Sequence, residues 1–378
     1  MKAVVERDEF AGAVVWAARY APAKPLSGYG ALSGLLVRAA DGALTVVGAD
    51  GDTWATATVP ARVHNEGTVL LPARLVSDVA AKLPQADVEL SLDESEVTLT
   101  CGTLSLTTPT VPAADYPVVP GLPPTLGEVD AAPFAAAVAR VAVATSKEDD
   151  QPYSKAVYLE GAEDGLRMSS TDRYRIARTT VEWKPAAGRG ADAVALVPVV
   201  ALADLAKSAS GTVGVHLGDD ARTIGLTWPG RQVTTGLIST KLPGYDRVLN
   251  AHAGGVEATL TVDRQVLADA LGRVAVVYEG GKAVPRLHLD LSAGELTVRV
   301  GTDRGRTSES VAVVYDGQPR SMQCNAYYLE AALKSAGGDV VRVGLTPDAV
   351  NSLVFHGETD PNWVHMLVML RDPAREER

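Results

Sequence analysis

The chain has little of several residue types, and each shortage excludes a class of protein. Only two of its 378 residues are cysteine, Cys101 and Cys324, which excludes a disulfide scaffold and a cysteine-based zinc site. No run of about 18 apolar residues is present, which excludes a transmembrane helix. Residues 1–10 turn acidic at once and lack the apolar core of a secretory leader, so we expect a cytoplasmic protein.

Aromatic side chains and cations are also scarce. Aromatics make up 5% of the chain, so the core is built from many small aliphatic side chains. Lys and Arg number 35 against 46 Asp and Glu, which gives a net charge of −11. An acidic surface argues against a protein that coats DNA, because phosphate binding favours a basic one. Basic residues gathered on one protected face remain compatible with this balance.

Enzyme signatures are missing as well. The six histidines fall in no metal-ligand spacing, and the glycines around Gly28 lack the spacing of a dinucleotide loop. Neither a Walker A loop nor a nucleophile elbow is present. The acidic cluster Glu148–Asp150 fits a solvated loop better than a metal site. We expect no cofactor, no metal and no catalytic residue, although carboxylates that meet only in space remain an open alternative.

Three sets of sequence markers recur in the same order. An Asp ends a strand-like segment at three places, an apolar residue marks a helix upstream, and a second helix opens downstream. The markers of each set lie 122 to 132 residues apart, close to one third of the chain; they are Asp50, Asp172 and Asp303, then Phe10, Phe134 and Val266, then Pro72, Pro198 and Asn325.

The repeats predict an α+β protein of three similar domains. Between the helices, segments such as residues 97–108 alternate apolar and polar side chains, which is typical of antiparallel strands. Each repeat would hold two helices packed on antiparallel sheets of about eight short strands in total. We place the domains at 1–120, 121–252 and 253–378. The Pro-rich stretches 114–128 and 241–255 are interpreted as linkers.

The predicted helices carry cations opposite their apolar faces. In any single helix this pattern also fits an ordinary solvated face. If all six helices line one surface, the same cations form a basic stripe, as expected of a ring around DNA. These cations are Arg19, Arg74, Lys82, Arg140, Lys147, Lys207, Arg273 and Lys334.

With these repeats in place, several motifs resemble the bacterial DNA sliding clamp, the beta subunit of DNA polymerase III, especially its actinobacterial form. They are VERDEFAGAVVWAAR at 5–19, PAKP around Lys24, TCGTLSLTTPTVPAADYP at 100–117, SSTDRYRIA at 169–177, KLPGYDRVL at 241–249 and CNAYYLEAAL at 324–333. The resemblance covers the whole chain. It implies a head-to-tail dimeric ring, with helices lining the pore and sheets outside.

The resemblance also implies partners and sites. The ring would encircle duplex DNA without sequence preference and act near the nucleoid. A clamp loader would place it, and it would tether the DNA polymerase III alpha subunit and other proteins with a clamp-binding motif; no membrane partner is implied. The implied peptide pocket consists of Ser154, Thr171, Arg173, Tyr174, Arg175, Ile176, Pro243, Arg247, Val248, Asn325, Tyr328, Val350, Ser352, Met366, Leu367, Val368, Met369, Leu370 and Arg371. For any one of these residues a purely structural role fits as well.

Two further sets follow from the same resemblance. The DNA-facing residues would be Lys24, Arg74, Arg140, Lys147, Tyr153, Lys207 and Arg273. The dimer interface would consist of Thr103, Leu104, Ser105, Val276, Val277, Arg304 and Arg306.

The chain departs from the family pattern at partner sites. Met369 stands where a proline is usual, and Ser154 where a leucine is usual. Val200 replaces a frequent lysine, and residues 99–108 lack the arginine that often joins subunits. These departures suggest a diverged second copy of the clamp whose pocket excludes clamp-binding cyclic peptide antibiotics. The alternative is a non-processive scaffold or decoy that pairs with the housekeeping clamp or captures its partners.

Overall fold

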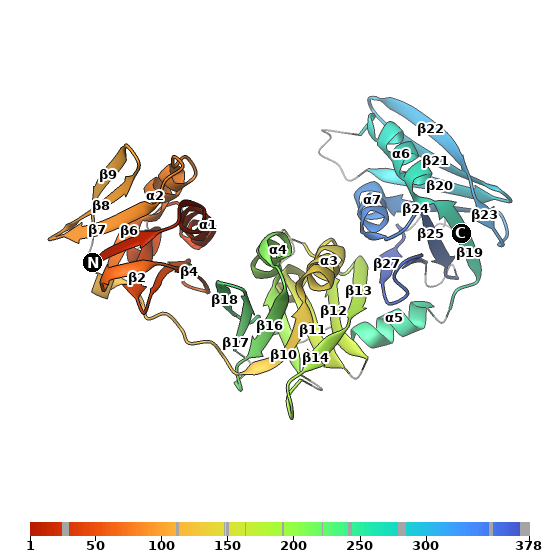
Figure 1. The fold of residues 1–378 in the computed structure, drawn as a ribbon. Coiled ribbons are helices and arrows are strands. Elements are labelled where there is room, and N and C mark those ends of the chain that lie inside the picture. The colour runs from red at the N-terminus through yellow and green to blue at the C-terminus, as the bar shows by residue number, and fades with distance from the viewer. Residues whose placement is uncertain are drawn as a thin grey trace. The chain divides into compact units, whose positions relative to one another are not determined.

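The computed structural model describes residues 1–24, 30–110, 113–146, 148, 151–162, 164–190, 193–220, 222–240, 244–253, 255–278, 285–347 and 351–370 (Figure 1). The chain divides into two compact units. The first is Met1–Ala131, Lys184–Arg189 and Ala209–Leu237, and the second is Ala132–Trp183, Gly190–Ser208 and Ile238–Arg378. Within the described ranges, no helix combines the length and hydrophobicity that a membrane crossing requires.

The first unit packs two helices against two antiparallel sheets. One sheet has the strand order β5-β1-β7-β8-β9 and the other β14-β10-β16-β17-β18-β4-β3-β2-β6. The elements are β1 (Lys2–Val5), α1 (Arg7–Ala17), β2 (Gly34–Ala40), β3 (Ala43–Ala49), β4 (Thr53–Pro60), β5 (Arg62–Asn65), β6 (Gly67–Pro72), α2 (Ala73–Ala80), β7 (Val88–Asp93), β8 (Glu96–Cys101), β9 (Leu104–Pro109), β10 (Thr125–Asp130), β14 (Trp183–Pro185), β16 (Thr212–Leu217), β17 (Thr223–Trp228) and β18 (Arg231–Gly236).

The second unit also has two antiparallel sheets. Their strand orders are β15-β11-β12-β13-β27-β26-β25-β19-β23 and β22-β21-β20-β24. The elements are α3 (Ala131–Ala142), β11 (Ala156–Ala162), β12 (Gly165–Thr171), β13 (Arg175–Val181), β15 (Val194–Pro198), α4 (Val199–Ser208), α5 (Tyr245–Ala253), β19 (Ala258–Asp263), α6 (Arg264–Ala275), β20 (Arg286–Ser292), β21 (Glu295–Thr302), β22 (Gly305–Ala312), β23 (Val314–Tyr315), β24 (Arg320–Asn325), α7 (Ala326–Ser335), β25 (Val340–Leu345), β26 (Ser352–Gly357) and β27 (Val364–Val368).

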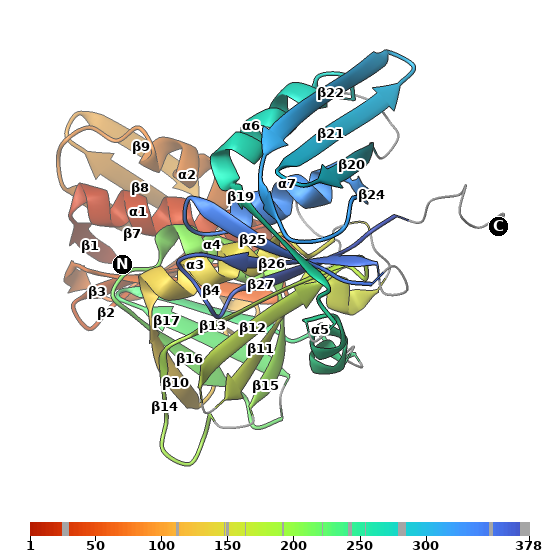
Figure 2. The same ribbon diagram turned by 90° about the vertical axis from the view of Figure 1, so that its right-hand side faces the viewer.

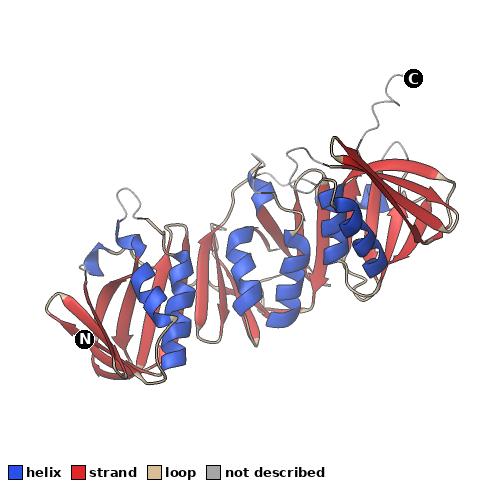
Figure 3. Ribbon diagram, turned by 90° about the horizontal axis from the view of Figure 1, so that it is seen from above, coloured by secondary structure: helices blue, strands red, loops and turns tan. Residues whose placement is uncertain are grey.

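The predicted fold class and its threefold repeat are confirmed. In the described part of the chain each repeat holds nine strands, one more than expected, in the series β1–β9, β10–β18 and β19–β27. The six predicted helices are α1 to α4, α6 and α7; Figure 3 shows helices lying in pairs against the strands. The domain limits remain a prediction, because the two compact units divide the second repeat between them.

One predicted linker is wrong. The stretch 241–255 contains α5, a nine-residue helix that packs through Tyr245 and Leu249 on the sheet of the second unit. The flanking Gly and Pro residues indicated a turn, but between them Tyr245, Val248 and Leu249 have helical spacing and an apolar surface to cover.

Short-range hydrogen bonds explain where the helices begin. The carboxylate of Glu6 accepts from the backbone N of Glu9 at 2.9 Å, and Asp263 accepts from Val266 at the same distance. Asn325 caps α7 by accepting from Tyr327. Such caps satisfy amide groups that have no partner inside the helix. The apolar faces then enter the core, where Phe10 of α1 is fully buried.

The repeated Asp motif forms a tight turn between the third and fourth strands of a repeat. Asp50 accepts hydrogen bonds from the backbone N of Asp52 and Thr53. Asp172 does the same for Tyr174 and Arg175. An Asp at such a turn replaces missing backbone partners with its own carboxylate. The sequence repeat therefore reflects a repeated turn geometry.

Neighbouring repeats join through the same pair of strands. The fourth strand of the first repeat, β4, pairs with the ninth strand of the second, β18. In the same way β13 of the second repeat pairs with β27 of the third. The ninth strand of the first repeat, β9, and the fourth strand of the third, β22, each end a sheet, so among the described residues each has a neighbouring strand on one side only (Figure 2).

Among the described residues, both ring nitrogens of the fully buried His365 on β27 lack a hydrogen-bond partner. Burial, and then the nearby charge of Arg175, lower the pKa of His365 to about 3. The neutral ring is thus built into the folded state, while the unfolded chain takes up a proton near the ordinary pKa of about 6.5.

We therefore predict that acid destabilises the protein through His365. Its contribution is complete above about pH 6.5 and is lost as the pH falls toward 3, by about 2 kcal/mol at pH 5. Urea unfolding followed by tryptophan fluorescence measures the loss, and the ring of Trp363 lies 6.1 Å from that of His365. His365→Leu should make the pH profile between 7 and 5 shallower, and His216 and His356, whose pKa values are also lowered by burial, account for part of the slope that remains. The exposed His64→Leu should not change the profile. A wild-type profile that is already flat would contradict the assignment.

Candidate functional site

The candidate site lies in the second unit, where β13 and β27 join the second repeat to the third. Arg175 pairs with Leu367 and Ile176 with Met366 across this seam. A small apolar cluster covers it: Ile176, Tyr245, Leu249, Val354 and Met366 are buried, and Tyr158, Val248, Val364 and Val368 pack against them. The rings of Tyr158 and Tyr245 stack at 5.6 Å. The seam thus has an apolar surface made by both repeats and α5.

A buried ion pair stands beside this surface. The Nε atom of Arg175 donates to the carboxylate of Asp172 at 2.8 Å, and both side chains are at most 10% exposed. The guanidinium of Arg175 lies 4.2 Å from the ring centre of Tyr328 on α7. Burial, and then the charge of Asp172, raise the pKa of Tyr328 to about 12, so its hydroxyl stays protonated and donates to Asp172. Asp172, Arg175 and Tyr328 therefore form one connected unit.

The segment after β27 closes the other side. The backbone N of Val368 donates to the carbonyl of Tyr174 at 2.9 Å, and that of Met369 donates to the carbonyl of Asn351. Leu370 then bridges to Gln323 of β24. The chain from 366 to 370 is thus fastened to the β12–β13 turn and to the third repeat.

Several predicted pocket residues are brought together here. Arg173 and Tyr174 are exposed at the turn, and Tyr328 and Val368 are half-buried. Other predicted pocket residues stabilise the local backbone. The hydroxyl of Thr171 donates to the carbonyl of Arg175, and the side chain of Asn325 caps α7. Buried within the seam are Arg175, Ile176, Ser352, Met366, Leu367 and Met369, while Arg247 and Leu370 remain accessible.

Ser154, the expected pocket wall with a serine in place of the usual leucine, lies shortly before β11. It is fully buried, and its hydroxyl donates to the carbonyl of Gln151 at 2.6 Å. Its role as a wall of the pocket stays a prediction. The residues Gly28, Lys147, Asp149, Asp150, Pro243, Val350, Arg371 and the tail 372–378 lie outside the described ranges, and of Lys207 only the backbone on α4 is described.

Sequence reasoning missed two contributors to this site. Asp172 was recognised as a repeat marker only, although it holds both Arg175 and Tyr328. Tyr245 and Leu249 were assigned to a linker, whereas Arg247 and Val248 of the same helix were among the predicted pocket residues. The helical spacing of Tyr245, Val248 and Leu249 was the available signal.

The predicted DNA-facing cations differ in their surroundings. Lys24 and Arg74 are exposed, and Tyr153 is half-buried. Arg140 forms an ion pair with Asp360, and Arg273 forms one with Glu309. The hydrogen bond to Glu309 is also the main cause that raises the pKa of Arg273. Ion pairing leaves less free positive charge at these two positions than the sequence suggests.

The predicted interface residues fall at the two open strands. Thr103, Leu104 and Ser105 lie at the start of β9, which ends the sheet of the first unit. In the second unit, Arg304 and Arg306 lie at the start of β22. Val276, 67% exposed, and the partly buried Val277 follow α6, and the carbonyl of Val277 accepts from Thr302.

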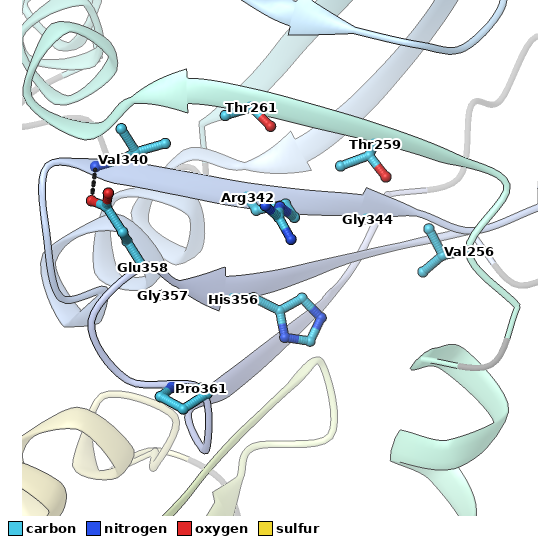
Figure 4. A pocket seen from close by; sticks show the side chains of 10 residues that line it. All are labelled: Val256, Thr259, Thr261, Val340, Arg342, Gly344, His356, Gly357, Glu358 and Pro361. Carbon is cyan, nitrogen blue, oxygen red and sulfur yellow. Dashed lines mark hydrogen bonds between the residues drawn. The ribbon is translucent and has the colours of Figure 1, made fainter.

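A concavity of about 620 Å³ lies on β19, β25 and β26 (Figure 4). Thr261, Arg342 and His356 form a row across its floor, and Val256 and Pro361 stand at its margins. Among its described lining residues, Glu358 carries the one carboxylate.

Comparisons with known proteins agree with this geometry. Models of the N-terminal, central and C-terminal domains of the DNA polymerase III beta subunit match residues 1–120, 128–244 and 255–371. The beta sliding clamp of Streptomyces coelicolor is 32% identical over 98% of this chain and 99% of its own. A beta sliding clamp homolog, GriR of Streptomyces muensis, is 32% identical over 87% of each chain.

A solved structure extends the comparison to the fold. The Pseudomonas aeruginosa sliding clamp bound to griselimycin aligns with a TM-score of 0.88, at 24% identity, over 98% of this chain and 100% of that one. The chain therefore belongs to the family of the DNA polymerase III beta subunit, the bacterial sliding clamp. Members of this family are non-catalytic processivity factors.

We predict that Asp172→Asn destabilises the protein by about 3 kcal/mol, because it leaves the guanidinium of Arg175 buried without its counter-charge. Chemical denaturation at pH 7 measures the change. The matched control is Asp50→Asn, which alters the equivalent but exposed turn of the first repeat and should cost less than about 0.5 kcal/mol. Equal effects of the two variants would show that Asp172 acts only as a turn residue.

Proposed function

We propose that this chain is a working sliding clamp, which closes around duplex DNA as a head-to-tail homodimer. The proposal rests on the strand pairing that joins neighbouring repeats. The fourth strand of one repeat pairs with the ninth strand of the next, as β4–β18 and β13–β27 do. The fourth strand of the last repeat, β22, and the ninth of the first, β9, have no such partner in the part of the chain that the structure describes. A second copy supplies both partners, and unpaired strand edges favour such pairing.

The register of the two existing seams supports a specific pairing between copies. The first residue of the fourth strand faces the second-last residue of the ninth: Thr53 faces Thr235, and Arg175 faces Leu367. The equivalent pairs at the subunit boundary are Gly305 with Thr108 and Thr307 with Leu106 of the second copy. Leu104, Ser105 and Arg306 of the predicted interface would then lie within this ladder, and the exposed Val276 would add apolar contact.

Weak attraction suits a protein that moves along DNA. Encirclement holds DNA by topology, so a few non-specific phosphate contacts suffice, and an acidic outer surface discourages binding elsewhere. The ion pairs of Arg140 and Arg273, and the 75% exposed Val200 on α4, fit a pore with little free charge. A clamp loader would place the ring on DNA in the cytoplasm, at the nucleoid.

The pocket at the β13–β27 seam would hold the clamp-binding peptide of the DNA polymerase III alpha subunit and of other partners. The partly buried members of the apolar cluster, such as Val248 and Val368, offer anchoring contacts, and Arg247 and Arg173 offer positive charge. Tethering raises the effective concentration of the polymerase at the primer end, which is the physical origin of processivity.

We further propose that the pocket is altered against peptide antibiotics that target clamps. Overall identity does not favour either role, since GriR and the Streptomyces coelicolor clamp are both 32% identical to this chain. Met369 supports the specialised role. Its backbone N donates to Asn351 at 2.9 Å, a hydrogen bond that the proline usual at this position cannot donate. The end of the pocket strand is thereby fixed.

We predict long products from primed circular DNA in the presence of this chain, the clamp loader and the polymerase. The amount of griselimycin that halves product length should be at least about tenfold higher than for the Streptomyces coelicolor clamp, the matched control, if the altered pocket disfavours the antibiotic by about 1.4 kcal/mol.

The other outcomes separate the parts of the proposal. Equal sensitivity of the two clamps would contradict the altered pocket and leave an ordinary clamp. Short products from a folded protein, with the control clamp active in the same mixture, would contradict the working clamp and favour the decoy.

A further inference from the structure

The turn between β12 and β13 holds Arg173 in a conformation that arginine rarely adopts. Its φ is +79°, in the left-handed region that favours glycine. The equivalent turn of the first repeat has Gly51 after its Asp, with a φ of +104°. In the third repeat Arg304 follows Asp303, but the positive φ falls on Gly305. Only the second repeat, beside the pocket, therefore places a long cation where the backbone favours glycine.

Hydrogen bonds keep this strained turn in place. The carboxylate of Asp172 accepts from the backbone N of Tyr174 and of Arg175, each at 3.1 Å. The hydroxyl of Thr171 accepts from the backbone N of Arg173 at 3.0 Å. Strain of this kind persists where the surroundings fix the backbone, and it is concentrated at functional sites.

The side chains of this turn form an alternating row of cations and aromatic rings. The guanidinium of Arg173 lies 5.9 Å from the ring centre of Tyr174. The ring of Tyr174 lies 6.4 Å from that of Tyr328, which in turn carries the guanidinium of Arg175 at 4.2 Å. Cations over aromatic faces attract the ring electrons, so neighbouring members of the row support one another.

The two ends of the row differ in how far their side chains are buried. Arg175 and Tyr328 are fixed by Asp172 and are largely covered. Tyr174 is 53% exposed, and Arg173 is exposed beside it. The backbone of Tyr174 is tied to Val368, the segment that closes the pocket. The exposed pair therefore stands at the margin of the proposed pocket, on a backbone that is held in place.

We propose that Arg173 and Tyr174 form a rim that makes the pocket selective for linear peptides with an acidic flank over neutral cyclic peptides. An acidic flank gains an ion pair with Arg173. A neutral cyclic peptide has no group for that charge and must displace Tyr174 from Tyr328 to enter. The inference rests on the proposed function of the pocket and assigns its selectivity to two residues.

Fluorescence polarisation on the full chain tests the rim with two probes, an acidic linear clamp-binding peptide and griselimycin. Arg173→Gly should weaken the linear peptide about fivefold and reduce the salt dependence of its affinity, because a partly exposed ion pair is lost. The same variant should tighten griselimycin about fivefold. Tyr174→Ala should tighten griselimycin as well. Arg173→Lys should keep most of the affinity for the linear peptide, since it keeps the charge.

The control for strain is Glu94→Gly. Glu94 is also exposed and has a φ of +48°, but it lies in the β7–β8 turn of the first repeat. This variant should leave both affinities unchanged. If Arg173→Gly leaves them unchanged too, or shifts both in the same direction, the rim is overturned while the pocket stands. If neither probe binds the wild type or any variant, the proposed pocket function fails, and the rim fails with it.

Discussion

The structure depends on one interaction, the antiparallel pairing between the fourth strand of a repeat and the ninth strand of the next. Backbone amides at a sheet edge need partners, and this pairing supplies them at β4–β18 and at β13–β27. Each junction turns two repeats into one continuous sheet. A chain with a finite number of repeats must leave one strand of each kind open, here β9 and β22. Assembly is therefore a consequence of how the repeats themselves are joined.

The proposed peptide pocket lies at the same junction. Arg175 begins the fourth strand and Met366 lies on the ninth, so the walls of the pocket come from two repeats held in a fixed register. The ion pair of Arg175 with Asp172 fixes the turn before the strand, and the ring of Tyr328 covers its guanidinium. The turn between β12 and β13 therefore has two roles: it leads into the strand that joins the repeats, and it presents Arg173 and Tyr174 at the margin of the proposed pocket.

The threefold repeat could be predicted from the sequence because its markers are local. Asp50 and Asp172 hydrogen-bond to residues two and three positions further on, and helix caps such as Asn325 act over a similar range. The residues of the proposed pocket came mostly from the family resemblance. The helix α5 was missed because Pro and Gly on both sides of a short apolar pattern favoured a linker.

The remaining features required the tertiary structure. The ion pair of Arg140 with Asp360 joins residues 220 positions apart, and nothing in the sequence near Arg140 indicates it. The fourth-to-ninth pairing and the positive φ of Arg173 are likewise invisible in a single sequence. Both arise from how distant segments meet, and both carry the functional conclusions.

A cross-link between two copies tests the central claim most directly. Leu106→Cys and Thr307→Cys in one chain should face each other across the subunit boundary, and the native Cys101 and Cys324 are both buried. The account predicts a covalent dimer under mild oxidation, and a dimer oxidised after loading should remain on circular DNA in high salt and leave once the DNA is cut. An off-register pair, Leu106→Cys with Ser308→Cys, should cross-link much less. Equal cross-linking of the two pairs, or none in either, would contradict the fourth-to-ninth rule as the means of closure.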